Sequence, residues 1–142
     1  MYPYRYTVSL RLWHPKRDLA AATIAFGLRP SRTWKQGEPR KTPTGTPMPG
    51  VFTNSYWTAR LVSEKKGVSS KREGIEAFLL QTVERFRDRR AFISSLRKSG
   101  GRAELFVGLF GTKNFAVELE PSVLQAAARL GLAIGFDIYP TK

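Results

Sequence analysis

The residues from Tyr4 to Leu12 alternate strictly between apolar and polar side chains, and this pattern constrains the fold more than any other feature of the chain. The apolar set is Tyr4, Tyr6, Val8, Leu10 and Leu12, interleaved with Arg5, Thr7, Ser9 and Arg11. A period of two is typical of a β-strand with one buried face. Other elements of the chain must therefore cover that face.

The length of 142 residues suits one compact domain, so we expect residues 1–142 to form a single α+β domain. Hydrophobic residues make up 42% of the chain, which excludes a disordered, low-complexity protein. Because there are no cysteines, disulfides, thiolate metal sites and cysteine nucleophiles are excluded as well.

The first half of the chain predicts a strand, a helix, a loop and a second strand. Asp18 is placed to cap a short helix that Gly27 and Pro30 end. Residues 29–55 contain five prolines and three glycines, so we expect a long, irregular, basic loop that is mobile or folded over the domain. The second strand is expected over residues 56–62.

The second half predicts two helical regions and three strands. Ser70 and Glu73 have the spacing of a capping box, followed either by one helix or by two with a charged kink at 87–90. Strands are expected over 103–110, 115–119 and 132–139, with a tight turn at 111–114 and a helix over 121–131. The order β-α-β-α-β-β-α-β favours a mainly antiparallel sheet with helices packed on one face.

Positive charge is concentrated in the N-terminal half. The formal net charge is +13, and residues 1–72 hold 14 basic side chains against 3 acidic ones. Such a field favours anionic partners, including nucleic acid and acidic proteins. An alternative with equal weight is a basic surface without a ligand, produced by the arginine usage of a GC-rich bacterial genome.

The two faces of the predicted sheet differ in character. We expect the helices to cover the face made by Val8, Leu10, Leu105, Val107, Val117, Ile134 and Ile138. The opposite face then presents Arg5, Arg11, Trp13, Phe106, Phe110, Asp137 and Tyr139. Aromatic and arginine side chains on an open sheet bind RNA in several folds. Coverage of these rings by the 29–55 loop or by a second subunit is the favoured alternative.

No group of residues in the sequence forms a recognisable catalytic site. The single histidine, His14, is followed by Pro15 and lacks a nucleophile motif, so we expect a turn histidine. The carboxylates Glu104, Glu118, Glu120 and Asp137 lack the spacing of a metal site, and the glutamates are expected to pair with arginines across the strands. The glycines form no phosphate-binding motif. We therefore expect a non-enzymatic protein without a cofactor or a metal.

The sequence contains neither an apolar run long enough to span a bilayer nor a signal-peptide pattern at its start. We therefore expect a cytoplasmic protein with no membrane partner.

Two separated motifs resemble a known family. Residues 26–31 (FGLRPS) and 33–38 (TWKQGE) resemble the L-G-[LI]-x-P-[ST] and T-W-x-x-G-[DE] segment of the bacterial domain-of-unknown-function family 4279. Residues 130–132 (LGL) and 136–139 (FDIY) resemble the family's closing signature, and Phe26 departs from its usual leucine. The resemblance covers about residues 4–140 and implies no catalytic residue or cofactor. In size and build such families are similar to immunity proteins that neutralise toxins, which is an analogy only.

The sequence favours a non-enzymatic module that binds a protein through the 29–55 loop and the adjacent sheet face. The expected contact residues there are Arg11, Trp13, Arg32, Trp34, Lys35 and Arg40, because arginine and aromatic side chains dominate interface energetics. The alternative is nucleic-acid binding through the same basic loop with Trp13, Phe106, Phe110 and Tyr139. A homodimer is left open.

Overall fold

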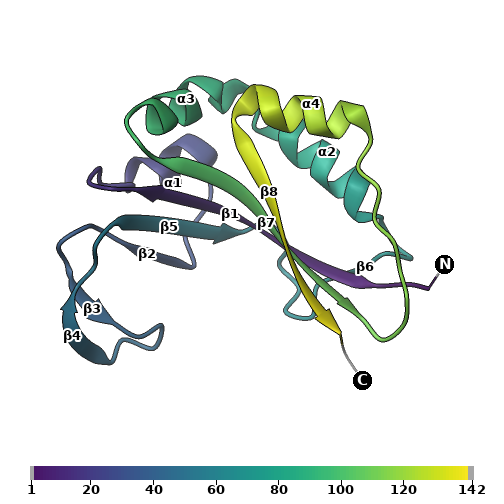
Figure 1. The fold of residues 1–142 in the computed structure, drawn as a ribbon, viewed down its shortest axis with the longest axis horizontal. Helices are drawn as coiled ribbons and strands as arrows, with labels where there is room; N and C mark the ends of the chain where they lie inside the picture. The colour runs from purple at the N-terminus through teal and green to yellow at the C-terminus, as the bar shows by residue number, and fades with distance from the viewer. Residues whose placement is uncertain (1, 141–142) are drawn as a thin grey trace.

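A computed structural model of the chain, described over residues 2–140, has the α+β fold that the sequence predicts (Figure 1). Its elements are β1 (Arg5–His14), α1 (Ala21–Phe26), β2 (Arg32–Trp34), β3 (Pro39–Lys41), β4 (Pro47–Val51), β5 (Ser55–Arg60), β6 (Val68–Ser69), α2 (Ile75–Arg85), a 3₁₀ turn (Arg87–Arg89), α3 (Arg90–Lys98), β7 (Arg102–Gly111), α4 (Pro121–Leu130) and β8 (Leu132–Pro140).

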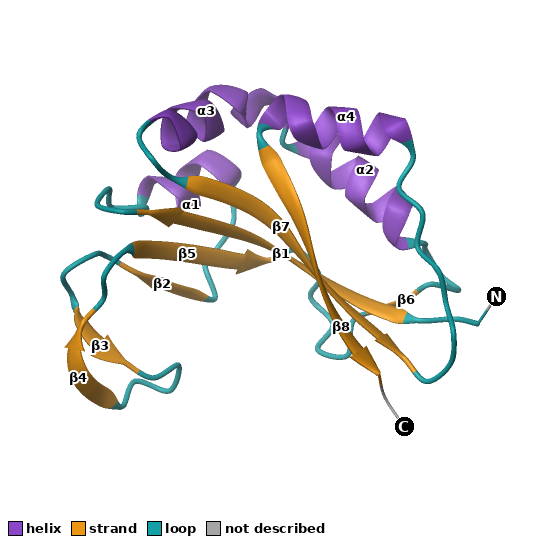
Figure 2. Cartoon of the chain, viewed as in Figure 1, coloured by secondary structure: helices purple, strands orange, loops and turns teal. Residues whose placement is uncertain are grey.

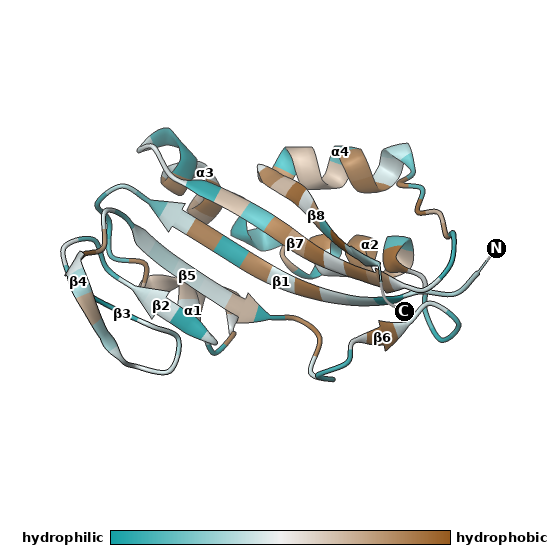
Figure 3. Ribbon diagram, turned by 60° about the horizontal axis from the view of Figure 1, so that its bottom comes forward, coloured by the Kyte–Doolittle hydropathy of each residue, from teal (hydrophilic) through white to brown (hydrophobic). Residues whose placement is uncertain are grey.

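The alternating segment forms β1 at the centre of the main sheet. The strand order is β2-β5-β1-β7-β8, and β6 pairs with the start of β1 beyond the end of β5. Tyr6, Val8, Leu10 and Leu12 are almost fully buried on one side, and Figure 3 shows part of this alternation as brown bands separated by white or teal bands along β1. The sheet is antiparallel except for β7 and β8, which are parallel and joined through α4.

The α-helices of the described residues all cover the same face of the sheet (Figure 2). Their apolar sides meet the buried sides of β1, β5 and β7 in one core, whose largest member is the fully buried Trp57. The indole nitrogen of Trp57 donates a hydrogen bond to Thr23 Oγ1 at 3.2 Å, which ties β5 to α1. Gly27 ends α1 in the left-handed conformation (φ 63°), as the sequence predicts.

The 29–55 segment is not the irregular loop expected from its composition. Residues 32–34 add an edge strand to β5, and β3 and β4 form a separate two-stranded hairpin with a register shift. Figure 2 shows this hairpin projecting on the side opposite the helices. Its prolines, which have no backbone N–H, are tolerated because many backbone groups of an exposed two-stranded hairpin have no strand partner.

The predicted strand over 115–119 and the hairpin turn at 111–114 are wrong. Residues 112–120 form a connection without strand pairing, and it leads from the end of β7 into α4. Phe115, Val117 and Leu119 still alternate because they pack against the core from outside the sheet. Val117 therefore does not belong to the buried sheet face, and Ile138 on β8 is 63% exposed instead of covered.

The predicted capping box is also wrong, and the helix it was expected to start begins later. Gly74 is the N-cap of α2, while the Ser70 hydroxyl accepts the backbone N–H of Tyr4 at 2.9 Å. The Tyr4 hydroxyl in turn accepts the N–H of Ile75, the first residue of the helix, at 3.2 Å. A tertiary contact thus replaces the local cap. Of the two alternatives for the following segment, two helices joined by a short 3₁₀ turn are observed.

None of the helices in the described part of the chain is both long enough and apolar enough to span a membrane.

Candidate interaction surface

The face of the sheet opposite the helices, here called the open face, carries most of the predicted contact residues. Cross-strand register places Arg5 opposite Phe110, which is opposite Tyr139, and Ser9 opposite Phe106. Trp13 is opposite Tyr56, which is opposite Trp34 on β2. This assignment of side chains to the open face matches the alternation read from the sequence.

Arg11 lies at the centre of the open face among three aromatic rings. Its guanidinium carbon is 4.3 Å from the ring centre of Phe106, 4.8 Å from that of Trp13 and 5.7 Å from that of Tyr56. Its Nε donates a hydrogen bond to the Tyr56 hydroxyl at 3.0 Å. Attraction between a cation and the faces of aromatic rings holds such a side chain in one position. We call these four residues the arginine cluster.

Glu104 supplies a negative charge beneath the arginine cluster. Its side chain is only 9% exposed, and its carboxylate lies 3.7 Å from Arg11 Nη1 and 3.0 Å from Arg102 Nη2. Gly135 on the neighbouring strand makes room for it, because a Cβ there would come within 2.7 Å of Glu104 Oε2. The carboxylate is therefore paired with arginines, as the sequence suggested.

Trp34 connects the arginine cluster to the segment that leads to the projecting hairpin. Its ring stacks on Phe52 with the centres 4.3 Å apart and the planes 9° from parallel, and it lies 4.6 Å from the ring of Tyr56. Arg32 sits 4.7 Å from the centre of the Trp34 ring. The rings at this end of the open face thus form a second, small apolar cluster, part of which comes from the 29–55 segment.

Basic side chains surround a hollow between Trp34 and the hairpin. The hollow has a volume of about 450 Å³, and Arg32, Arg40 and Lys41 contribute to its lining. Lys35, another predicted contact residue, is exposed directly after β2 and does not line it. Glu38 is the only acidic side chain between residues 29 and 55. This end of the surface is therefore strongly positive.

Phe110 and Tyr139 form a second aromatic pair at the far end of the open face. Their rings stack with centres 4.8 Å apart and planes 8° from parallel. The hydrogen bond that Tyr139 donates to Asp137 raises the pKa of the Tyr139 hydroxyl. These two rings come together as a pair and contact neither Trp13 nor Phe106 among the aromatic pairs of the described residues.

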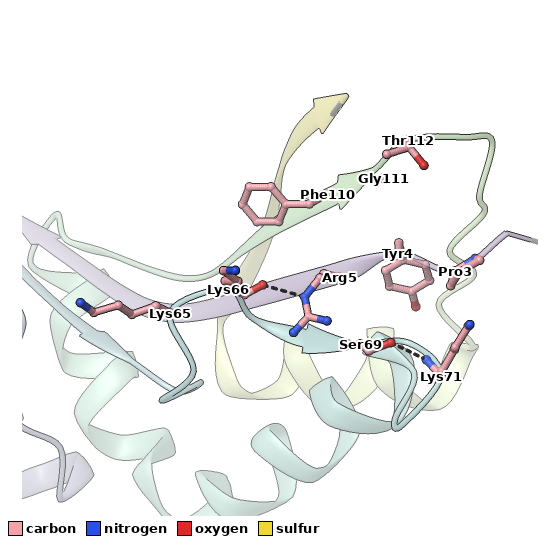
Figure 4. A pocket seen from close by; sticks show the side chains of 10 residues that line it. All are labelled: Pro3, Tyr4, Arg5, Lys65, Lys66, Ser69, Lys71, Phe110, Gly111 and Thr112. Carbon is pink, nitrogen blue, oxygen red and sulfur yellow. Dashed lines mark hydrogen bonds between the residues drawn. The ribbon is translucent and has the colours of Figure 1, made fainter. Parts of the chain in front are cut away.

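A second basic hollow, which we call the lysine hollow, adjoins Phe110. It has a volume of about 580 Å³ and is lined by Arg5, Lys65, Lys66 and Lys71 together with Tyr4, Phe110 and others (Figure 4). Arg5 is fixed there because its guanidinium donates to the carbonyl oxygens of Lys66 and Gly67 at 3.0 and 2.7 Å. Among the described residues, no carboxylate lines this hollow.

His14 is buried at the end of β1 and forms a hydrogen bond between its Nε2 and Ser99 Oγ at 2.9 Å. Its Nδ1 accepts the backbone N–H groups of Lys16 and Arg17 at 3.0 and 2.7 Å. The ring proton must therefore reside on Nε2, which donates to Ser99. In this tautomer His14 cannot accept the serine proton. Burial, and secondarily the charge of Arg17, lowers the pKa of His14.

The remaining carboxylates do not converge. Glu118 and Glu120 lie together in the connection before α4, and the hydrogen bond that protonated Glu120 donates to Glu118, together with the negative charge of Glu118, raises the pKa of Glu120. Glu104 is on the open face instead, among the arginines. Within residues 2–140, no three acidic, histidine or cysteine side chains lie close enough to hold a metal ion.

Two residues of this surface, Tyr56 and Phe52, were not predicted from the sequence. Tyr56 lies next to Trp57, and the two adjacent aromatic residues gave no indication of which faces the core. Phe52 follows a proline-rich stretch in which no strand was expected. Only the stacking of Phe52 on Trp34 shows that Phe52 belongs to this surface. For Tyr56 a signal was present, because a period-two pattern beginning at Ser55 assigns Tyr56 to the open face.

Comparison with known proteins places the chain in a family. Residues 4–141 match the family described as domain of unknown function DUF4279. The chain belongs to this family. The match confirms the resemblance carried by the two motifs, and in this DUF4279 protein those motifs end α1 and form β2 and β8. Neither the curated proteins nor the solved structures give a match.

Proposed function

We propose that this DUF4279 protein is a non-enzymatic binding module that holds an acidic protein partner against the open face and the projecting hairpin. The observation that carries the proposal is the arginine cluster, in which Arg11 is held by three rings before any partner arrives. Arginine and aromatic side chains that are ordered in advance lose little conformational entropy on binding.

The arrangement of the rings favours a protein over a nucleic acid at this end of the face. Trp34 already contacts Phe52 on one side and Tyr56 on another, and Phe106 is covered by Arg11. A base would have to displace these contacts in order to stack. A protein surface requires no such displacement, because it binds the edges of rings and the outer faces of guanidinium groups.

Charge supports an acidic partner. Arg32, Lys35, Arg40 and Lys41 are opposed by Glu38 alone in the 29–55 segment, and the chain as a whole carries +13. Complementary charge accelerates association and rejects basic proteins.

Affinity capture with matched charge variants tests the proposal. The full-length tagged protein is incubated with native lysate, with and without nuclease, beside R32A/K35A/R40A and the control R87A/R89A/R90A. Both variants lose three cations, but the control removes exposed cations from the helical side of the molecule. We expect a stoichiometric, nuclease-resistant protein partner on the wild type and on the control, and its loss from the first variant. Equal retention by both variants contradicts the proposed surface.

Nucleic-acid binding is a second candidate because of the lysine hollow. Four cations without a carboxylate lie beside the Phe110 ring, and this combination binds the phosphates and bases of single strands. If this candidate is correct, wild-type affinity for a single-stranded RNA probe falls steeply with salt. Loss of three phosphate contacts in K65A/K66A/K71A then reduces the log-log salt slope by about 2, whereas R87A/R89A/R90A leaves it unchanged. A flat salt dependence of the wild type removes the candidate.

A further inference from the structure

The outer edge of β8 is a long unpaired edge of the main sheet in the described part of the chain. β8 extends over Leu132–Pro140 and pairs only with β7, so the backbone groups on its other side have no strand partner in the described chain. Proteins usually protect such an edge with lysines, prolines, a bulge or a very short strand. The opposite edge strand, β2, has three residues, two of which are Arg32 and Trp34. β8 has nine residues, no cation, and a proline only at its end.

The side chains of β8 are also unusually apolar for an edge. Phe136 is 41% exposed and Ile138 is 63% exposed on the helical side of the sheet. They border a hollow of about 710 Å³ to which Leu109, Val117 and Leu119 contribute apolar lining. Figure 1 shows that α4 lies over the start of β8 and leaves its C-terminal half uncovered.

The total exposed area of the chain is also large enough to include an interface. The chain exposes 8884 Å², whereas a monomer of this mass typically exposes about 7,400 Å². The projecting hairpin accounts for part of the difference of about 1,500 Å². A standard interface buries about 800 Å² on each partner, so the excess is large enough to include one.

We infer that two copies of this chain pair antiparallel through β8, with the two-fold axis at Phe136. In this register Ile134 of one copy faces Ile138 of the other, and the two Phe136 rings meet at the axis. On the opposite side of the sheet the small residues Ala133 and Gly135 face the larger Tyr139 and Asp137. The strand is thus complementary to itself from Ala133 to Tyr139, as an isologous interface requires.

The low charge of the β8 edge makes a second copy of this chain a suitable partner for it. Two molecules of charge +13 repel one another over most of their surfaces. The β8 edge avoids this repulsion, because Asp137 is its only charged residue and the carboxylate accepts the Tyr139 hydroxyl. Antiparallel pairing also brings the uncovered half of one β8 beside the half of the other that α4 covers. The open faces remain accessible, so the dimer does not depend on the proposed function.

Sedimentation velocity of the full-length chain from about 1 to 200 µM tests the dimer. The variant I138K places a charge opposite Ile134 twice in each dimer, and I24K is the matched control because Ile24 is 88% exposed on α1, away from β8. We expect the wild type and I24K to reach about 32 kDa, twice the chain mass of 16.0 kDa. Dimer affinity of I138K falls on the order of a hundredfold. A monomeric wild type, or equal dimerisation of the two variants, overturns the inference.

Single cysteines test the register, because the native chain has none. Across the proposed axis, F136C thiols lie within disulfide range, whereas A133C thiols are separated by about 20 Å along the two strands. Mild oxidation should therefore crosslink F136C and leave A133C monomeric on a denaturing gel. Crosslinking of A133C, or its absence in F136C, contradicts the proposed pairing.

Discussion

Acidification should destabilise this protein through His14. The imidazole is 6% exposed, and its Nδ1 accepts two backbone N–H groups from the turn after β1. Protonation of Nδ1 would point an N–H at two other N–H groups and break both hydrogen bonds. Burial is the larger cause of the lowered pKa, and the nearby positive charge of Arg17 is the second.

The sign and the limit of the effect follow from proton linkage. In the unfolded chain the histidine titrates near pH 6.5, whereas in the folded chain it stays neutral to a lower pH. As the pH falls below 6.5, the unfolded state binds a proton that the folded state does not, so the free energy of unfolding decreases. The contribution of His14 is complete above pH 6.5 and is lost as the pH falls through the folded pKa. One proton limits the loss to about 1.4 kcal/mol between pH 7.5 and 5.5.

Urea unfolding followed by tryptophan fluorescence measures this change, since the buried Trp57 reports on the core. His14→Gln is the control, because its amide keeps one acceptor and one donor but does not titrate. We expect the wild type to lose up to about 1.4 kcal/mol from pH 7.5 to 5.5, and the variant to lose much less. The reasoning is refuted by a wild type whose stability is constant or rises over this range, or by a variant with the same loss.

Two further substitutions test single contacts of the fold, each by urea denaturation at pH 7.5. Tyr4→Phe leaves the buried N–H of Ile75 without its acceptor and should cost about 1 to 2 kcal/mol, whereas Tyr2→Phe, at an exposed ring, should cost nothing measurable. Gly67→Ala should cost about 2 kcal/mol or more, because φ is +80° and the new Cβ collides with the Tyr6 carbonyl. Gly37→Ala, with φ +89° but open space around the Cβ, should cost clearly less, and an equal loss at the two glycines would contradict the collision.

Local periodicity was sufficient to predict the centre of the fold. The alternation along β1 reports burial directly, because every second side chain faces the same helices. The same rule failed at residues 115–119. Phe115, Val117 and Leu119 also alternate, but they pack from a connection that has no backbone ladder. A pattern of side chains shows which residues approach the core and does not show whether their backbone is paired.

Composition was a weaker guide than periodicity. The prolines of residues 29–55 excluded a central strand correctly, yet they allowed an exposed hairpin and a three-residue edge strand. The helix start at residue 75 was missed for a different reason. Its N-terminal amide is satisfied by Tyr4, 71 residues earlier, and no local motif can reveal such a contact.

The sequence predicted most residues of the candidate surface, but it did not predict which of them contact one another. Alternation assigned Arg11, Trp13 and Phe106 to one face, whereas strand order decides which of them meet. Tyr56 joins Arg11 only because β5 is the neighbour of β1, and Glu104 joins it because β7 is the other neighbour. A single sequence does not contain that order, so the cluster could be recognised only in three dimensions.

The open face and the β8 edge differ in charge, and the composition of the chain does not show this difference. Arg11 and Arg102 on the open face are fixed in place by aromatic rings and by one carboxylate, Glu104, which offsets only one of their two positive charges. The β8 edge has no cation, and its exposed side chains are apolar. A single anionic ligand suits the first surface and gains little from the second. The two proposed contacts, one with an acidic partner and one with a second copy, therefore use different surfaces of the chain.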